Sequence, residues 1–174
     1  MPRRHSDSQE FSRFIEADSV GAKPIERRIS ANAEERAALA ERFELRKIDR
    51  LEAEFSLRRA GNGVIHVKGR VQGDVVQSCV VPLEPVAARI DEECAADFAA
   101  EAKGQAAEEE IYFDAADPPE AIRNGHIDLG ELAAEHLSLA LDPYPRAPGA
   151  RLPQGSEPAE PEERPVNPFS ILKK

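Results

Sequence analysis

The sequence predicts an α+β fold, in which a curved antiparallel sheet of about five or six strands packs against two helices and a disordered Pro-rich C-terminal tail follows. Three observations lead to this prediction. Apolar and polar residues alternate over much of residues 51–98, which is the pattern of half-buried strands. Two segments, 30–43 and 128–141, carry the cap residues and the 3.6-residue apolar periodicity of helices. Eight of the fourteen prolines lie between Pro143 and Pro168.

The first helix follows a short N-terminal segment. Residues 1–20 are expected to be flexible, and residues 21–142 are expected to form a single α+β domain. Asn32 can cap the first helix, and Glu35 lies three residues further on, as a capping box requires. A narrow apolar stripe completes the helical pattern, formed by Leu39, Ala40 and Phe43.

The next segment predicts a β-hairpin. Residues 51–58 alternate between apolar and polar side chains, and residues 65–75 do the same. Gly61-Asn62-Gly63 lies between them and suits a tight hairpin connection. Gly69 and Gly73 interrupt the second strand, which predicts bulges or close approach of neighbouring backbone.

Further strands complete the predicted sheet. Residues 86–98 continue the alternation, and Ile111-Tyr112-Phe113 is a short additional candidate. The segment 99–110, rich in Ala and Glu, is compatible with either a loop or a weak helix. Taken together, these segments are expected to form a curved antiparallel sheet with the two helices against it.

The second helix is the clearest element of the chain. Asp128 can cap it, and Glu131 repeats the spacing of a capping box. Its wide apolar stripe consists of Leu129, Leu132, Ala133, Leu137, Ala140 and Leu141.

Residues 143–166 contain too little apolar surface to offset the entropy of ordering and are expected to be an extended or disordered linker. Residues 167–174 then form an apolar and basic peptide, in which Phe169, Ile171 and Leu172 are candidate partner-docking residues.

Composition excludes several classes of protein. The formal net charge of −10 argues against a protein that coats nucleic acid through its overall field. The acidity is uneven, because residues 1–80 hold 15 Lys+Arg and 13 Asp+Glu whereas residues 81–174 hold 8 and 20. No apolar run approaches the roughly 18 residues of a membrane span, and no apolar segment near the N-terminus suggests a secretory signal. We therefore expect a cytoplasmic protein with no membrane partner.

Residues that could carry catalysis are few. Cys79 could act as a nucleophile with His66, His126 or His136 as its base, but only the residue types support this, and cysteine is commonly a small buried hydrophobe. A polar cluster on and before the second helix could hold a metal through carboxylates; it consists of His126, Asp128, Glu131, Glu135 and His136. Helix capping and a solvated helix face explain these residues more simply. We expect no enzyme activity, no metal and no cofactor.

Candidate RNA-binding residues lie in the predicted hairpin: Arg58, Arg59, His66, Lys68 and Arg70. If His66, Lys68 and Arg70 share a strand face with Arg58, they form a local positive patch that can contact phosphates. Aromatic residues that would stack on single-stranded bases are not interleaved with them. Glu52 and Glu54 on the neighbouring strand would neutralise part of the patch, so an ordinary mixed-charge strand remains an alternative.

The acidic half of the chain offers the opposite kind of partner. The segment 99–120 contains a run of carboxylates and would attract cationic ligands such as basic ribosomal proteins: Glu108, Glu109, Glu110, Asp114, Asp117 and Glu120. A solvated loop explains the same residues.

Several segments of the chain resemble the bacterial YceD family. The resemblance covers roughly residues 10–174 and rests on Gln77-Ser78-Cys79-Val80-Val81-Pro82-Leu83-Glu84-Pro85-Val86, Asp128-Leu129-Gly130-Glu131-Leu132-Ala133-Ala134-Glu135 and Leu139-Ala140-Leu141-Asp142-Pro143-Tyr144-Pro145. Residues 167–174 and Phe11-Ser12-Arg13 resemble the alphaproteobacterial branch of that family.

The resemblance implies a cytoplasmic, non-enzymatic factor linked to the synthesis, processing or accumulation of large-subunit ribosomal RNA. Its expected partner is that RNA or a pre-ribosomal particle, and the alternative is an acidic chaperone or adaptor for a basic ribosomal protein. Many relatives have Cys-x-x-Cys where this chain has Cys79-Val80-Val81-Pro82, and a second cysteine group after the helix. Tyr144, Arg146 and Gly149 occupy that second region here, so the zinc site that such relatives suggest is not expected.

Overall fold

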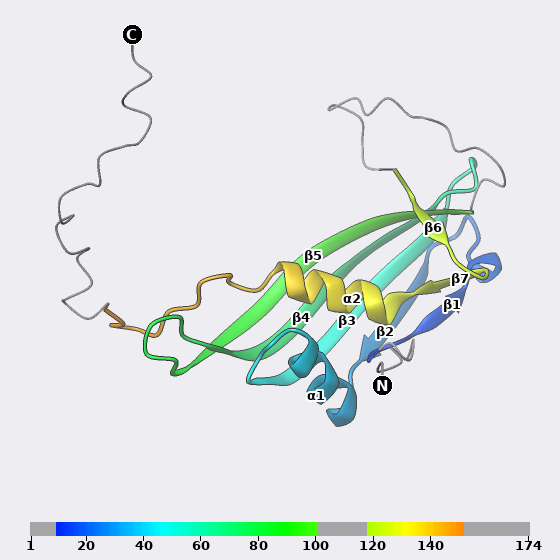
Figure 1. The fold of residues 1–174 in the computed structure, drawn as a ribbon. Coiled ribbons are helices and arrows are strands. Elements are labelled where there is room, and N and C mark those ends of the chain that lie inside the picture. The colour runs from blue at the N-terminus through cyan, green and yellow to red at the C-terminus, as the bar shows by residue number, and fades with distance from the viewer. Residues whose placement is uncertain (1–9, 101–117, 152–174) are drawn as a thin grey trace, which may run out of the picture.

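A five-stranded sheet in the order β2-β3-β4-β5-β6 forms the centre of the molecule (Figure 1). The computed structural model describes residues 10–100 and 118–151. Within them the elements are β1 (Phe14–Glu16), the 3-10 turn η1 (Ala17–Ser19), β2 (Ile25–Ser30), α1 (Ala33–Arg42), β3 (Lys47–Arg59), β4 (Ile65–Ser78), β5 (Pro85–Ala100), β6 (Glu120–Ile122), β7 (His126–Asp128) and α2 (Leu129–Leu139). The predicted α+β class is confirmed.

Both helices begin at the predicted caps. The Asn32 side chain accepts hydrogen bonds from the backbone N–H groups of Glu34 and Glu35, and the Glu35 carboxylate accepts one from the Asn32 N–H at 2.8 Å. This reciprocal pair is a complete capping box. Asp128 caps α2 by accepting from the N–H groups of Gly130 and Glu131. The caps satisfy backbone donors that the helices themselves leave unpaired.

The sheet is mixed rather than wholly antiparallel. Strands β2 to β5 pair antiparallel, but β6 pairs parallel to the end of β5, with Phe98 opposite Glu120. Parallel neighbours need a long connection, and residues 101–119 between β5 and β6 are long enough to supply it. β2 is a further edge strand that the sequence pattern did not indicate. The predicted strand at residues 111–113 lies outside the described residues.

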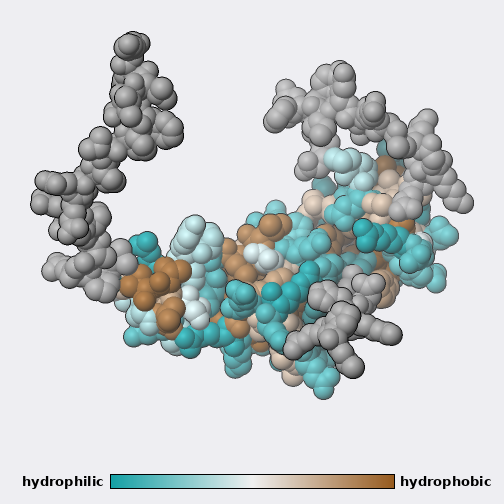
Figure 2. Space-filling model, in the orientation of Figure 1, coloured by the Kyte–Doolittle hydropathy of each residue, from teal (hydrophilic) through white to brown (hydrophobic). Residues whose placement is uncertain are grey.

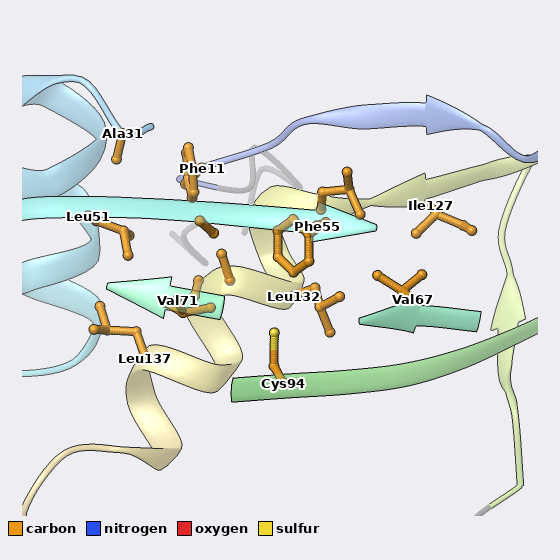
Figure 3. Packing of buried hydrophobic residues seen from close by; sticks show 14 of the residues in the cluster. Phe11, Ala31, Leu51, Phe55, Val67, Val71, Cys94, Ile127, Leu132 and Leu137 are labelled. Carbon is orange, nitrogen blue, oxygen red and sulfur yellow. The ribbon is translucent and has the colours of Figure 1, made fainter. Parts of the chain in front are cut away.

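One face of the sheet, here called the inner face, packs against both helices. A single cluster of buried side chains joins this face to Leu39 of α1 and to Leu132 and Leu137 of α2. Figure 3 shows Phe55 of β3 and Cys94 of β5 within this core, close to Leu132. The opposite face of the sheet, here called the outer face, has no helix against it in the described part of the chain.

The two strand glycines allow close packing inside this core. A Cβ on Gly69 would lie 2.4 Å from the Phe55 ring and 2.6 Å from the Glu54 carbonyl oxygen, and one on Gly73 would lie 2.8 Å from Leu137. These distances confirm the predicted close approach. The register shift of β3 lies elsewhere, between Ile48 and Arg50.

The N-terminal segment is part of the domain from residue 10 onward, which corrects the expectation of a flexible segment over residues 1–20. Strand β1 pairs with β7, and Phe11, Ile15 and Val20 are buried in the core. Nothing in the sequence indicated this burial, because these apolar residues form no periodic pattern. Residues 1–9 lie outside the described residues.

The first part of the expected linker also contacts the domain. The Pro145 carbonyl accepts a hydrogen bond from the Val80 N–H at 2.9 Å, and the Ala147 N–H donates to the Cys79 sulfur at 3.2 Å. Figure 2 shows an apolar patch at the end of the molecule formed by the turn between β4 and β5, where Val80 and Leu83 are exposed. Residues 152–174, which include Phe169, Ile171 and Leu172, lie outside the described residues.

Candidate nucleic-acid interface

Four of the five candidate RNA-binding residues share the outer face of the sheet. Arg58 of β3 lies opposite His66 of β4, and Lys68 and Arg70 follow at alternate positions of β4. Ile65 and Val67, which flank His66 in the sequence, are buried on the inner face. Because successive side chains of a strand point to opposite faces, the geometric condition for a common basic row is confirmed.

Arg59 does not belong to this row. Its guanidinium donates from Nε to the Val20 carbonyl at 2.9 Å, from Nη2 to the Ala17 carbonyl at 2.5 Å and from Nη1 to the Gly63 carbonyl at 3.2 Å. These bonds hold the segment after β1 against the end of β3. The structure therefore gives Arg59 a structural role on the other side of the strand.

Carboxylates on β5 pair with two members of the row. Arg70 donates from Nε and Nη2 to the two oxygens of Asp91, at 2.5 and 2.8 Å. This hydrogen bonding lowers the pKa of Asp91 and raises that of Arg70. The His66 Nδ1 lies 2.6 Å from an oxygen of Asp97. Both pairs are exposed, so a phosphate can replace the carboxylate at little cost, because exposed ion pairs contribute only about 0–1 kcal/mol.

Arg58 and Lys68 differ from their neighbours. Both side chains are exposed, and neither forms an ion pair with any described residue. Around them, acidic and basic side chains are about equally numerous on the outer face: Glu26, Glu52, Glu54, Asp74, Asp91, Glu93 and Asp97 against Arg28, Arg50, Arg58, Lys68, Arg70 and Arg89. The unpaired positive charge on this face is therefore concentrated at the two residues next to the β3–β4 hairpin.

Neither cysteine is placed for nucleophilic chemistry. Cys79 is fully buried and its sulfur accepts the Ala147 N–H. Cys94 is in the core, where burial raises the pKa of its thiol to about 11. A nucleophilic cysteine needs a lowered pKa and access to substrate, so the hypothesis of a catalytic Cys79 gains no support from the geometry.

The polar cluster of α2 has structural partners. Asp128 accepts the Arg13 N–H at 2.7 Å in addition to its cap bonds, and Glu131 receives two hydrogen bonds from Arg42, at 2.6 and 3.0 Å. Among the described residues, no group of three His, Cys, Asp or Glu side chains has the arrangement of a metal site. Capping thus explains Asp128 and ion pairing explains Glu131, whereas Glu135 has no ion-pair partner among the described residues.

A groove that the sequence did not reveal lies beside the N-terminal half of α2 and is here called the α2 groove. It has a volume of about 870 Å³ and is lined by β1, the end of β5, β6, β7 and α2. Phe14, Phe98, Ile127 and Leu132 provide apolar lining, and the carboxylates at it are those of Glu120, Asp128, Glu131 and Glu135. The sequence indicated the helix carboxylates as a polar cluster. It gave no sign that Phe14, more than 100 residues earlier, lies beside them.

The described residues contain no helix long and apolar enough to cross a membrane. Comparisons with curated proteins and with solved structures find no match. A family model described as "Large ribosomal RNA subunit accumulation protein YceD" matches residues 67–174. This match covers more than half of the chain and includes Lys68, Arg70, β5 and α2, whereas Arg58 and His66 precede it. The chain therefore belongs to the YceD family.

Proposed function

We propose that this chain is a non-enzymatic, cytoplasmic factor that supports the synthesis, processing or accumulation of large-subunit ribosomal RNA by binding that RNA or an assembly intermediate. The family description supports the ribosomal part of the proposal. The observation that carries the binding part is the outer face of the sheet, where Arg58 and Lys68 are exposed and have no carboxylate partner in the described structure.

Phosphate contact starts in this proposal at Arg58 and Lys68. Their charges are available without breaking an ion pair, and each phosphate neutralised releases condensed counterions. Arg70 and His66 extend the contact when phosphates replace Asp91 and Asp97. The balanced charge of the rest of the face limits the contact to a few phosphates, as suits a factor that binds one site on an RNA and does not coat it.

The absence of catalysis in this proposal agrees with the described side chains. The cysteines are buried, Asp128 caps α2 and Glu131 pairs with Arg42. Glu135 is the carboxylate of α2 whose pKa is raised, by burial and by the charges of Glu120 and Glu131. A binding factor needs no activated nucleophile, whereas covalent catalysis requires one.

Salt dependence of RNA binding tests the phosphate contact. The double variant Arg58→Ala with Lys68→Ala removes the two unpaired charges of the outer face. If each contacts one phosphate, the slope of log K against log salt falls in magnitude by about 2. The control variant Lys23→Ala with Arg27→Ala changes the net charge equally at exposed residues off the basic row, and its slope should stay unchanged. Equal slopes for both variants would overturn the assignment of Arg58 and Lys68.

The ribosomal role is tested in cells. Cross-linking followed by sequencing of the bound RNA should recover large-subunit ribosomal RNA, and depletion of the protein should lower the large-subunit peak in sedimentation gradients. Normal large-subunit levels together with no cross-linked ribosomal RNA would overturn the main proposal.

The second candidate function is that of an acidic chaperone or adaptor for a basic ribosomal protein, without direct RNA contact. It is favoured by the surplus of carboxylates in residues 81–174, which hold 20 Asp+Glu and 8 Lys+Arg. Co-purification of one basic ribosomal protein, persisting after ribonuclease treatment and in the Arg58→Ala with Lys68→Ala variant, would support this candidate over the first.

A further inference from the structure

The apolar lining of the α2 groove includes an aromatic ring that the described residues leave largely uncovered. Phe14 is 65% exposed although it lies in a paired strand, and its ring contacts His126 edge to face, with centroids 6.1 Å apart. Phe98, Ile127 and Leu132 line the groove beneath it and are at most 6% exposed, so Phe14 is the exposed side chain of these four. A large exposed aromatic side chain over an apolar groove is typical of a place where another apolar segment binds.

Carboxylates outnumber cations around this apolar surface: Glu120, Asp128, Glu131 and Glu135 line the groove together with one arginine, Arg123. Glu131 is paired with Arg42, but Glu120 and Glu135 form no ion pair with any described residue. Burial, followed by the nearby charges of Glu120 and Glu131, raises the pKa of Glu135. Cationic groups brought to the groove would therefore relieve repulsion between carboxylates that already face one another.

We propose that the C-terminal segment of this same chain, residues 167–174, occupies the α2 groove. In the sequence Asn-Pro-Phe-Ser-Ile-Leu-Lys-Lys, Phe169, Ile171 and Leu172 match the apolar lining, and Lys173 and Lys174 match the carboxylates. The last eleven residues contain no Asp or Glu, whereas Glu157-Pro158-Ala159-Glu160-Pro161-Glu162-Glu163 just before them is strongly acidic. The acidic stretch is thus followed by an apolar and basic one, whose lysines suit the carboxylates of the groove.

The length of chain after the last described residue permits this contact. Residues 145–147 lie on the turn that contains Cys79, beyond the C-terminal end of α2. Phe98 of the groove pairs with Ile65, at the other end of β4 from Cys79. Ile65 and Cys79 are 14 positions apart, so a strand rise of about 3.3 Å per residue separates the groove from this turn by about 45 Å. The residues from Arg151 to Asn167 can extend to about 50 Å, which is sufficient for residues 167–174 to reach the groove when the intervening chain is extended.

Paramagnetic labelling of the full-length chain tests the proposal. A nitroxide introduced through Ser170→Cys sits between the proposed apolar contacts, and the native thiols do not compete because Cys79 and Cys94 are buried. We expect loss of the amide signals of Glu120, Glu131 and Glu135, with the signals of the outer face retained. Retained groove signals, or losses confined to another surface, would overturn the proposal.

Charge reversal provides a second, independent readout. Lys173→Glu with Lys174→Glu should restore the groove signals of the labelled protein, and adding Glu120→Lys with Glu135→Lys should abolish them again. The matched control Glu26→Lys with Glu93→Lys changes exposed carboxylates of the outer face and should have no effect. Signal loss that is insensitive to every reversal would overturn the proposed charge complementarity.

The remaining occupants are distinguished by isotope mixing. In this experiment the nitroxide is on a chain without ¹⁵N, and the observed amides are on a ¹⁵N-labelled chain without nitroxide. If the segment binds within one chain, we expect no signal loss at low protein concentration. Signal loss in that mixture would show that the groove binds the segment of a second copy and would overturn binding within one chain. These outcomes are independent of RNA binding, so the proposal and the proposed function can fail separately.

Discussion

For the substitution Gly130→Ala, helix propensity and tertiary packing predict changes of opposite sign in the free energy of unfolding. It lies in the first turn of α2, and replacing a helical glycine with alanine ordinarily stabilises a helix by about 1 kcal/mol. In this structure a Cβ at residue 130 would lie 2.4 Å from the carbonyl oxygen of Phe11, 2.9 Å from its carbonyl carbon and 3.0 Å from the Arg13 nitrogen. These atoms belong to backbone, so they cannot rotate away as the end of a side chain would. We therefore predict that Gly130→Ala destabilises the chain.

The magnitude follows from what must move. Phe11 is 1% exposed, and burial of a side chain of this kind contributes about 1.5–3 kcal/mol. The Arg13 N–H donates to the Asp128 carboxylate at 2.7 Å, and the Arg13 carbonyl accepts from the Leu129 N–H at 3.0 Å. Weakening each of these bonds costs about 1 kcal/mol. After subtraction of the propensity gain, we expect a net loss of about 2–4 kcal/mol in the free energy of unfolding.

Urea unfolding of the full chain measures the effect as a lower midpoint at an unchanged slope. Gly21→Ala is the control, because a Cβ there meets no atom within 4 Å, and we expect a change of no more than about 1 kcal/mol, in the stabilising direction. Adding Phe11→Ala to Gly130→Ala should cost less than the sum of the two changes, since both act on the same segment. A Gly130→Ala variant as stable as the unsubstituted chain would refute the reasoning.

Three further predictions concern the caps, the pH and the thiols. Asn32→Ala should lower the free energy of unfolding by about 1 kcal/mol, because two helix N–H groups lose their acceptor; a change below about 0.3 kcal/mol in urea unfolding would count against the capping box. Hydrogen bonding from Arg13 lowers the pKa of Glu35 below 4.5, so its charge stabilises the fold above that pH and the contribution is lost as the pH falls through the lowered pKa. Glu35→Gln should accordingly be less stable than the native chain at pH 7, with the difference shrinking under acid; a difference that persists at the lowest pH would contradict this assignment. Cys79 and Cys94 should react with a disulfide reagent only as fast as the chain unfolds, and rapid titration of one thiol in native buffer would show that the burial is wrong.

The parts of the fold that the sequence predicted correctly depend on local interactions. Asn32 and Asp128 cap the helices through backbone groups two or three residues away, so a short window contains all the information. The alternation in β3 and β4 is similarly local, because burial of one face imposes a period of two. Gly69 was informative because an interior strand glycine needs a reason, and the close Phe55 ring supplies it.

The parts that the sequence did not predict depend on contacts between distant residues. Arg59 is adjacent to Arg58, and its residue type is equally suited to phosphate, yet its hydrogen bonds to Val20 and Ala17 follow only from the three-dimensional path of the N-terminal segment. The α2 groove requires Phe14 to meet a helix more than 100 residues away. The partners of Arg70 and His66 depend on the register of β5, which no local pattern specifies.

The carboxylates of the α2 groove and the phosphate contact proposed for the outer face are compatible because they lie on opposite faces of one sheet. Along β5, Asp97 points to the outer face and pairs with His66, whereas the next residue, Phe98, lines the α2 groove. The groove carboxylates are therefore separated from Lys68 by the sheet, and packed layers lie about 10 Å apart. Screening at physiological salt acts over about 8 Å, so repulsion from the groove is weak where Lys68 would meet a phosphate. The net charge of the whole chain thus predicts little about RNA contact at this face. Whether each cation of the outer face has a carboxylate partner predicts which of them can contact a phosphate.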